Sequence, residues 1–217
     1  MSEFIFNNKK YKYFKHPYNS TYTNERAVEI PIFKDLVDKY KDKRILEVGN
    51  VMKNYHSFKH DIVDLYEIDE GVINKDIRDY KTDKKYDLII SVSTIEHVDE
   101  LVDSTSEQGI LDALDSMRNL IAPFGDIYIS VPIAPNPSLN NLIINNKLGL
   151  KEAYYMKKDM FDDDKFNNNI WEQCKFSDIH TFSPCVCGYN TINKNGEKTG
   201  FLPIIGAKVI YLLIGRL

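Results

Sequence analysis

The chain has 217 residues, of which 43% are hydrophobic and 28% are charged, and its formal net charge is -4 at pH 7. This length suits one domain over residues 1–217, and the acidic balance argues against a general surface for nucleic acid. The first residues lack the apolar core of a signal peptide, and no apolar run approaches the roughly twenty residues that cross a membrane. We therefore expect a cytoplasmic protein that neither binds nucleic acid nor spans a membrane.

Helical and strand patterns alternate in the first part of the chain. Apolar residues recur with helical spacing over residues 22–40, where Asn24 is a candidate cap and Pro31 should kink or restart the helix. Short β-branched runs at 44–48 and 61–67 predict strands, and the interval between them leaves room for only a short helix.

The alternation continues to the middle of the chain. Strands are predicted near 71–74, at 86–92 and at 126–132, with an amphipathic helix at 107–121 before the last of them. Strands that alternate with helices are typical of a parallel sheet covered on both faces. The sequence therefore predicts a doubly wound, Rossmann-like α/β fold.

The second half of the chain changes in character. Residues 134–170 are rich in Asn, Lys and Asp with scattered aromatic residues, and we expect an insertion or lid there. Residues 171–217 can supply two final strands, whose antiparallel hairpin would complete a seven-stranded, mostly parallel sheet with an antiparallel last strand. Residues 1–43 would form an N-terminal helical or cap segment.

The cysteines are three in number: Cys174, Cys185 and Cys187. An odd count argues against a disulfide framework and suits a reducing compartment. A zinc site that includes His180 is the alternative, but a single residue separates Cys185 from Cys187, and structural zinc ligands are usually two to four residues apart. We expect no metal.

Polar side chains stand at or near the ends of the predicted strands. Ligands of open α/β sheets bind beyond the carboxyl ends of the strands, at the point where the strand order reverses. The residues that should converge on one cleft there are Glu47, Gly49, Asp64, Glu67, Asp76, Ser91 and Ser93.

Four segments, RILEVGN, DIVDLYEID, VINKDIRDY and YDLIISVSTIEHV, together resemble the cofactor-binding half of class I S-adenosylmethionine-dependent methyltransferases. The resemblance spans residues 20–135, and it implies a cofactor-binding core at 44–133 and S-adenosylmethionine as the cofactor. A narrower resemblance is to a group of methyltransferase-like proteins that have a single-glycine turn and are often associated with glycan biosynthesis.

In that family, the first strand ends in an acid and a glycine-rich turn, which lets the backbone approach the methionine part of the cofactor. This chain keeps the acid as Glu47 and the first glycine as Gly49, but has Asn50, Val51 and Met52 in place of the later glycines. Asn tolerates left-handed backbone geometry better than most residues, so the turn can survive at Asn50.

The resemblance also gives roles to the next acids. The acid at the tip of the second strand accepts hydrogen bonds from both ribose hydroxyls; Asp64 and Glu67 both qualify, and Glu67 is preferred because it lies 20 residues beyond Glu47. Asp76 would receive the adenine amino group while Ile77 packs on the ring. Each acid taken singly has a plain alternative role in a solvated loop or helix cap.

The segment after the fourth strand supplies the remaining candidates. Ser91, Val92 and Ser93 would line the methionine side of the cofactor. Glu96 and His97 are the predicted catalytic residues, since a histidine can take a proton from a substrate hydroxyl during methyl transfer. The alternative is that His97 only caps and packs the turn.

Five residues are candidates for binding the acceptor: Tyr22, Asn24, Arg26, Asn136 and Trp171. The first three precede the first strand of the core and could fold over the cleft, where Arg26 would suit an anionic group. Alternatively, Glu25 and Arg26 form an exposed pair at a helix end. An amide and an indole suit a sugar, because amides bind hydroxyls and an indole face stacks on the ring.

The sequence therefore predicts an S-adenosylmethionine-dependent methyltransferase that acts on a small polar acceptor such as a saccharide or glycan precursor. A different class of function is a binding or scaffold protein with this fold that lost turnover together with its glycines. Methylation of RNA or protein is disfavoured, because the chain is acidic and has no appended binding module.

Overall fold

The computed structural model describes residues 3–99, 106–133, 136–159, 170–179, 190–192, 198–201 and 209–217. Their main sheet has eight strands, in the order β5 (Val72–Asn74), β4 (Asp61–Asp64), β3 (Ile45–Val48), β6 (Tyr86–Val92), β7 (Ile121–Ile133), β12 (Val209–Arg216), β8 (Glu152–Asp159) and β9 (Glu172–Cys174). Two further pairs are β1 (Glu3–Phe6) with β2 (Lys9–Lys12), and β10 (Asn190–Ile192) with β11 (Lys198–Phe201).

The first five strands of the main sheet run parallel. β3 pairs in parallel with β4 and with β6, β4 with β5, and β6 with β7, while β9 is antiparallel to β8. The chain thus goes outward from β3 through β4 to β5 and then crosses to the other side of β3 at β6. This confirms the prediction of a mixed, mostly parallel, Rossmann-like α/β sheet, with eight strands rather than seven. The place where the order reverses lies between β3 and β6.

The described residues divide into two compact units. Unit 1 comprises Met1–Ile32, Pro132–Pro135 and Tyr154–Leu213, and unit 2 comprises Phe33–Val131, Asn136–Ala153 and Ile214–Leu217. The prediction of a single domain stays a prediction. Among the helices of the described residues, none has both the length and the apolar character that a membrane span requires.

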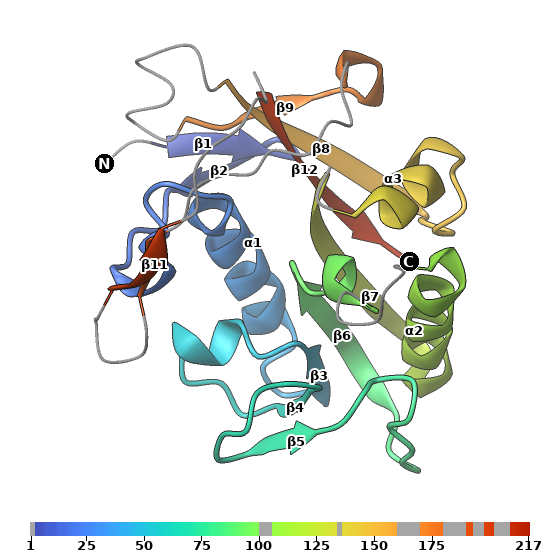
Figure 1. Cartoon of the computed structure of the whole chain (residues 1–217). Helices are drawn as coiled ribbons and strands as arrows, with labels where there is room; N and C mark the ends of the chain where they lie inside the picture. Colours follow the sequence, from blue (N-terminus) through green and yellow to red (C-terminus); the bar gives the residue numbers. More distant parts are fainter. Residues whose placement is uncertain are drawn as a thin grey trace. The chain divides into compact units, whose positions relative to one another are not determined.

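The parallel strands form the centre of unit 2. All four residues of β3 are buried, as are residues 88–92 of β6, so both faces of these strands are covered. Helix α2 (Glu107–Leu120) turns an apolar face with Ile110, Leu114 and Met117 into the core, and its N-cap Ser106 accepts a hydrogen bond from the Gly109 amide. Figure 1 shows α2 running beside β6 and β7.

Helix α1 (Arg26–Lys39) continues through Pro31 as a single helix, so of the two expectations, a kink or a restart, the restart does not occur. Proline has no backbone N–H, so it leaves the carbonyl of Ala27, four residues earlier, without its helical partner. The Phe14 amide donates to this carbonyl instead, at 2.9 Å. The N-terminal segment thereby compensates for the proline.

The N-terminal segment also contains the hairpin of β1 and β2, which the sequence reading did not predict. Asn7 and Asn8 connect the strands with φ values of 45° and 61°. Two successive left-handed residues are typical of the tight turn that matches the twist of antiparallel strands. A 3-10 turn, η1 (Tyr18–Ser20), follows before α1.

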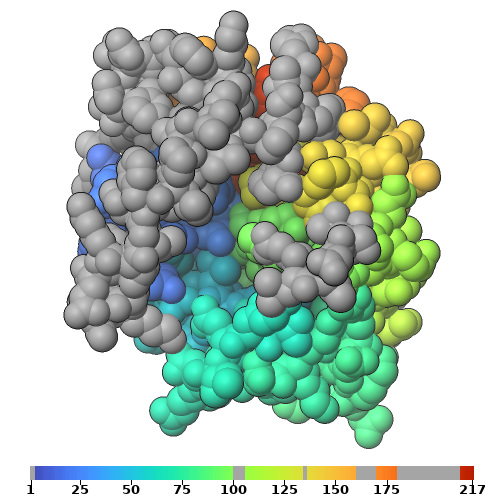
Figure 2. Space-filling model, in the orientation of Figure 1, coloured from blue at the N-terminus to red at the C-terminus, as the bar shows by residue number. Residues whose placement is uncertain are grey.

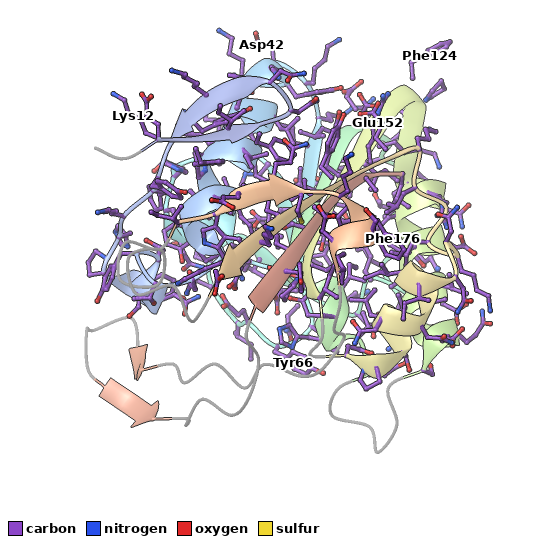
Figure 3. The ribbon with its side chains drawn as sticks, turned by 90° about the horizontal axis from the view of Figure 1, so that it is seen from above. Lys12, Asp42, Tyr66, Phe124, Glu152 and Phe176 are labelled. Carbon is purple, nitrogen blue, oxygen red and sulfur yellow. The ribbon has the colours of Figure 1, made fainter. Side chains whose placement is uncertain are left out.

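The segment 134–170, expected to be an insertion or lid, contributes α3 (Pro137–Ile144) and β8, and β8 belongs to the main sheet. Short 3-10 turns complete the described elements: η2 (Met52–Asn54), η3 (Ile95–His97) and η4 (Phe176–Asp178). The strand β7 begins at Ile121, earlier than predicted, and Figure 3 shows the fully exposed Phe124 projecting at its outer end.

Candidate functional site

A cavity of about 400 Å³ lies in unit 2, at the carboxyl ends of β3, β4 and β6. Its lining comes from residues 48–51, 63–67, 75–78, 93–95 and 97–99. The volume falls in the range of small-molecule sites, roughly 300–1,000 Å³, and the position is where an open α/β sheet binds its ligand. In the space-filling view, the residues that follow β3, coloured cyan to green, form one continuous region of the surface (Figure 2).

Gly49 forms the turn that follows β3 at the cavity wall. Its φ is +90°, and a Cβ atom added there would lie 2.1 Å from the Thr94 hydroxyl oxygen. Its amide donates to the Val63 carbonyl of β4 at 2.9 Å. Both the backbone conformation and the close approach of Thr94 therefore require glycine.

Glu47 does not line the cavity, but its carboxylate bonds to the backbone of this turn. The buried carboxylate accepts hydrogen bonds from the amides of Val51 at 2.8 Å and Met52 at 2.6 Å through Oε1. Its other oxygen, Oε2, lies 2.6 Å from His60 Nε2. Met52 is buried and does not fill the cavity. The acid thus fixes the backbone where the later glycines are missing.

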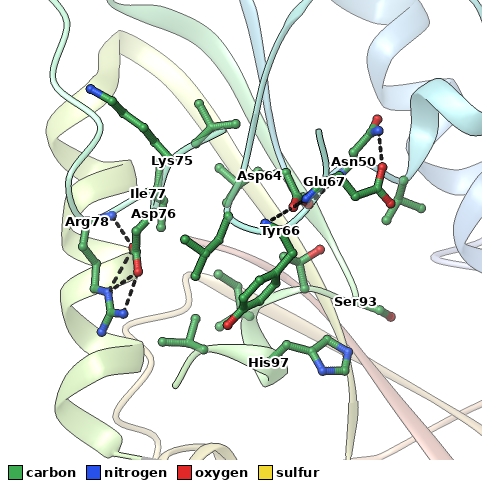
Figure 4. Close-up of a pocket in the computed structure, with 18 of the residues that line it drawn as sticks. Asn50, Asp64, Tyr66, Glu67, Lys75, Asp76, Ile77, Arg78, Ser93 and His97 are labelled. Carbon is green, nitrogen blue, oxygen red and sulfur yellow. Dashed lines mark hydrogen bonds and ion pairs between the residues drawn. The ribbon is translucent and has the colours of Figure 1, made fainter. Parts of the chain in front are cut away.

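Asn50 bonds to both Asp64 and Glu67, the two candidates for binding the ribose hydroxyls. Its amide donates to Asp64 Oδ2 at 3.0 Å, and its side-chain Nδ2 donates to Glu67 Oε2 at 2.5 Å. Asp64 Oδ1 also accepts the amides of Tyr66 and Glu67, so Asp64 acts as the cap of the turn after β4. Both acids line the cavity, and Glu67 has fewer bonds to the backbone than Asp64; Figure 4 shows its contact with Asn50.

Asp76 lies at the other end of the cavity, in an ion-pair network that the sequence reading missed. Arg78 contacts both oxygens of Asp76, with Nη2 at 2.6 Å from Oδ2, and its Nη1 lies 2.8 Å from Asp99 Oδ1. Burial would raise the pKa of Asp76, but the hydrogen bonds and charge of Arg78 outweigh it and lower the pKa. Figure 4 shows this pair apart from the pair of Asn50 and Glu67. Ile77 also lines the cavity.

Asp99 connects this network to α2. Its φ is +62°, and its Oδ2 accepts a hydrogen bond from the hydroxyl of the helix cap Ser106 at 3.1 Å. A Cβ atom at Gly109 would lie 1.8 Å from the same oxygen, so the glycine makes room for the carboxylate at the helix start. The wall of the cavity is therefore tied to the N-terminus of α2.

The three residues predicted at the tip of β6 separate into two groups. Ser91 and Val92 are fully buried and do not line the cavity, whereas Ser93 does. Ser93 has a left-handed φ of 39°, and its amide donates to the Ser130 carbonyl of β7 at 2.8 Å. Such strained residues are frequent at functional sites.

The two predicted catalytic residues, Glu96 and His97, differ in whether they reach the cavity. Glu96 is buried, and its backbone carbonyl accepts a hydrogen bond from the Asn136 side chain at 2.8 Å. The side chain of His97 is 50% exposed and lines the cavity, with Nε2 at 3.9 Å from Glu96 Oε1. Of the two, His97 is the one that a bound molecule can reach.

The residues predicted to bind an acceptor lie mostly in unit 1. Tyr22 is exposed, and Asn24 caps the start of α1, where its Oδ1 accepts the Arg26 amide at 3.1 Å. Arg26 is buried and pairs with Glu29 at 2.6 Å, rather than with Glu25 at an exposed helix end.

Trp171 has only 2% of its surface exposed, and its backbone bonds to the Tyr13 hydroxyl, so its burial does not favour stacking on a sugar. Asn136 belongs to unit 2 and caps α3, where it accepts the Leu139 amide at 3.0 Å. The role of these five residues in binding stays a prediction.

The cavity contains several residues that the sequence reading did not single out: Tyr66, Lys75, Arg78, Thr94, Val98 and Asp99. Arg78 follows Asp76 by two residues, which is the only signal in the sequence that could have suggested their pairing. Thr94 and Asp99 reach the site through loop conformations that no periodicity encodes.

Among the residues that the structure describes, no cluster of His, Cys, Asp and Glu could hold a metal ion. Cys185, Cys187 and His180 lie outside the described residues. Cys174 on β9 is a free thiol, and burial raises its pKa to about 11.

Neither the models of protein families nor the curated proteins include a match to this chain. Among solved structures, a SAM dependent methyltransferase from Archaeoglobus fulgidus is 15% identical, with a TM-score of 0.45 over 90% of this chain and 96% of that chain. The N-methyltransferase NodS from Bradyrhizobium japonicum WM9, in complex with S-adenosyl-l-homocysteine, is 11% identical, with a TM-score of 0.37 over 89% and 91%.

The sugar N-methyltransferase KedS8 from Streptoalloteichus sp ATCC 53650 is 14% identical, with a TM-score of 0.38 over 52% of this chain and 51% of that chain. The chain thus spans about half the length of KedS8, and likewise 48% of DesVI from Streptomyces venezuelae. Similarity at this level gives no information about activity. The fold assignment rests on the order of the strands in the main sheet.

Proposed function

We propose that this chain binds S-adenosylmethionine in the cavity of unit 2 and transfers its methyl group to a small polar acceptor, such as a sugar or glycan precursor. The observation that carries the proposal is the cavity itself, which places carboxylates at two separate ends around the turn at Gly49. A nucleoside with an amino-acid tail needs such a set of acceptors, because it offers a ribose diol, an amino base and an ammonium group.

The donor and acceptor groups of the cavity fit this ligand. Glu67 is the carboxylate for the ribose hydroxyls, since Asp64 is already taken up by backbone amides. The Oδ1 atom of Asn50 is buried and has no hydrogen-bond partner in the described part of the chain. A buried acceptor of this kind is costly unless a ligand satisfies it.

Asp76 would accept from the adenine amino group. Arg78 already contacts both of its oxygens, but each carboxylate oxygen has a further lone pair to offer. Ile77 would pack on the base, and Ser93 would line the opposite side of the ligand.

The bound cofactor would supply an electrophilic methyl group, and the chain would supply position and a proton acceptor. His97 stands half-exposed in the cavity lining, where it can take the proton of an acceptor hydroxyl or amine. Of the five residues predicted to hold the acceptor, Asn136 belongs to unit 2 with the cavity, and the roles of the other four stay predictions.

The test is calorimetric titration of the purified chain with S-adenosylmethionine and S-adenosylhomocysteine. We expect saturable binding of both, and a loss of about tenfold in affinity, or about 1.4 kcal/mol, in Glu67→Gln. Glu70→Gln is the matched control, because this exposed residue lies nearby but outside the cavity lining. Absence of binding at millimolar concentration would instead leave a scaffold protein with this fold.

A further inference from the structure

A second hollow of about 420 Å³ lies in unit 2 at the amino ends of the strands, where β3, β4 and β6 begin. The charged and titratable residues in its lining are Lys43, Arg44, Lys59, His60, Asp61, Lys84 and Tyr86. They come from three segments that are distant in sequence, so this groove is a product of the fold. Nothing in the proposed methyl transfer uses it.

The groove is basic although the chain as a whole is acidic. Four cationic side chains face one carboxylate, Asp61, which gives a net charge of +3 with His60 neutral. Asp61 Oδ2 is already bonded to Lys84 Nζ and to the Tyr86 hydroxyl, both at 2.8 Å.

The other three cationic side chains, unlike Lys84, have no carboxylate partner among the described residues. Lys43, Arg44 and Lys59 make no ion pair with any residue that the structure describes, and all three are exposed. Asp87 accepts a hydrogen bond from the backbone amide of Arg44 at 3.0 Å. An excess of like charge gathered in one hollow attracts anions.

His60 gives the groove a second, independent feature. Only 1% of its side chain is exposed, and its Nε2 lies 2.6 Å from Glu47 Oε2. Its other ring nitrogen, Nδ1, is buried and has no hydrogen-bond partner within the described ranges. Buried polar atoms are nearly always bonded, so an orphan in the lining of a basic hollow points to a missing polar partner.

We propose that this groove binds the phosphate group of a small anionic ligand, held by Lys43, Arg44 and Lys59, with one phosphate oxygen bonded to His60 Nδ1. A phosphate ester carries a charge of about -1.5 to -2 at pH 7, which suits the uncompensated cations. Its oxygens and hydroxyl can both accept and donate, so it satisfies Nδ1 in either protonation state of the ring. Arginine also matches phosphate with a two-pronged hydrogen bond.

The size of the groove favours a small ligand over a nucleic acid. Phosphate backbones are tracked by extended basic stripes, whereas these cations converge on one hollow. The ligand is therefore either inorganic phosphate or the phosphate of a small ester, and the two share the same contacts.

The experiment is titration of the full chain with inorganic phosphate and, separately, with a hexose 6-phosphate, at constant ionic strength. We expect saturable binding at one site and a loss of at least about tenfold in affinity when Lys43, Arg44 and Lys59 are all changed to Gln. Tighter binding of the hexose phosphate would identify an ester as the ligand, and equal or weaker binding would identify free phosphate.

The matched control changes Lys34, Lys39 and Lys147 to Gln, which removes the same charge from outside the groove. This variant should bind phosphate as the unmodified chain does. No saturable binding, or an equal loss in both triple variants, would overturn the proposal. If the groove variant does not fold, the single change Lys59→Gln together with the NMR shift of the His60 ring on phosphate addition gives the same decision.

Discussion

Gly49 is the residue of the candidate site where both backbone and side-chain space are fixed. A left-handed φ costs an L-residue about 1–2 kcal/mol, and the contact with Thr94 adds an overlap of the kind that costs about 1–3 kcal/mol. We therefore predict that Gly49→Ala lowers the free energy of unfolding by the sum of both and abolishes cofactor binding. Urea unfolding and calorimetric titration measure the two effects.

Gly71→Ala is the matched control for that change. Gly71 has a similar φ of +77°, but a Cβ atom there would meet nothing within 4 Å. Its substitution should cost only the backbone part, about 1 kcal/mol, and should spare cofactor binding. Equal losses in the two variants would contradict the assignment of Thr94 as the neighbour that excludes a side chain.

Arg78 gives the site a prediction in pH. The pKa of Asp76 is lowered by Arg78 despite burial, so this carboxylate stabilises the fold above its unfolded pKa and loses that contribution as pH falls through the folded pKa. In Arg78→Gln, part of the loss of stability below about pH 4 should therefore disappear, while stability at pH 7 falls. Chemical unfolding at a series of pH values measures this, and parallel curves for both proteins would argue against the pair.

The residues of the cavity differ in how far sequence could predict them. Gly49, Asn50, Glu67 and Asp76 follow from a simple rule, because strand ends in a parallel sheet meet at one edge. Ser91 was expected beside Ser93, but it is fully buried within β6 and does not line the cavity, whereas Ser93 follows the strand end with a left-handed φ of 39° and does line it.

At the scale of elements, buried parallel strands were the most predictable. β6 has the predicted bounds, residues 86–92, because an uninterrupted apolar run between polar turns suits a strand covered on both faces. The apolar spacing of α2 likewise predicted it to within one residue. Here local pattern and tertiary position agree.

β8 could not be found in the same way. Its sequence, EAYYMKKD, is half polar, and only two of its residues are buried. One of these is Lys158, whose Nζ donates to the Thr23 carbonyl at 2.9 Å. A strand that buries a lysine depends on a partner 135 residues away in the chain, and no local pattern records it.

The contact between the end of α1 and β7 gives a second prediction in pH. Tyr40, next after the helix, donates its hydroxyl to Asp126 of β7, and Arg216 also donates to Asp126 at 2.7 Å. Burial, with the hydrogen bond and charge of Asp126, raises the pKa of Tyr40 to about 12. The folded state therefore favours the neutral phenol.

A raised pKa stabilises the fold fully below the unfolded pKa, near 10 for tyrosine, and this contribution is lost as pH rises through about 12. We predict that Tyr40→Phe removes this part of the alkaline loss of stability, so that the two proteins converge as pH rises. Unfolding curves between pH 9 and pH 12 test it. A difference that stays constant over this range would mean that Tyr40 contributes packing alone.

At the largest scale, the cavity and the basic groove lie at opposite ends of the same three strands of unit 2. One path of hydrogen bonds joins them: His60 in the groove contacts Glu47, and Glu47 accepts the amides of Val51 and Met52 in the turn of the cavity. Because Glu47 bonds both to His60 and to the amides of this turn, we expect that restricting the His60 ring also restricts the turn beside the cavity.

We therefore predict that saturating phosphate strengthens the binding of S-adenosylhomocysteine by about fivefold, the lower end of typical coupling between sites. Phosphate bonded to His60 Nδ1 would restrict the ring, and the pre-ordered turn would then lose less freedom when the cofactor binds. His60→Gln should keep a donor for Glu47 but remove the coupling, and titrations in chloride of equal ionic strength exclude a salt effect. By linkage, the cofactor must strengthen phosphate binding by the same factor, so the two titrations check each other, and an unchanged affinity in both would contradict the coupling.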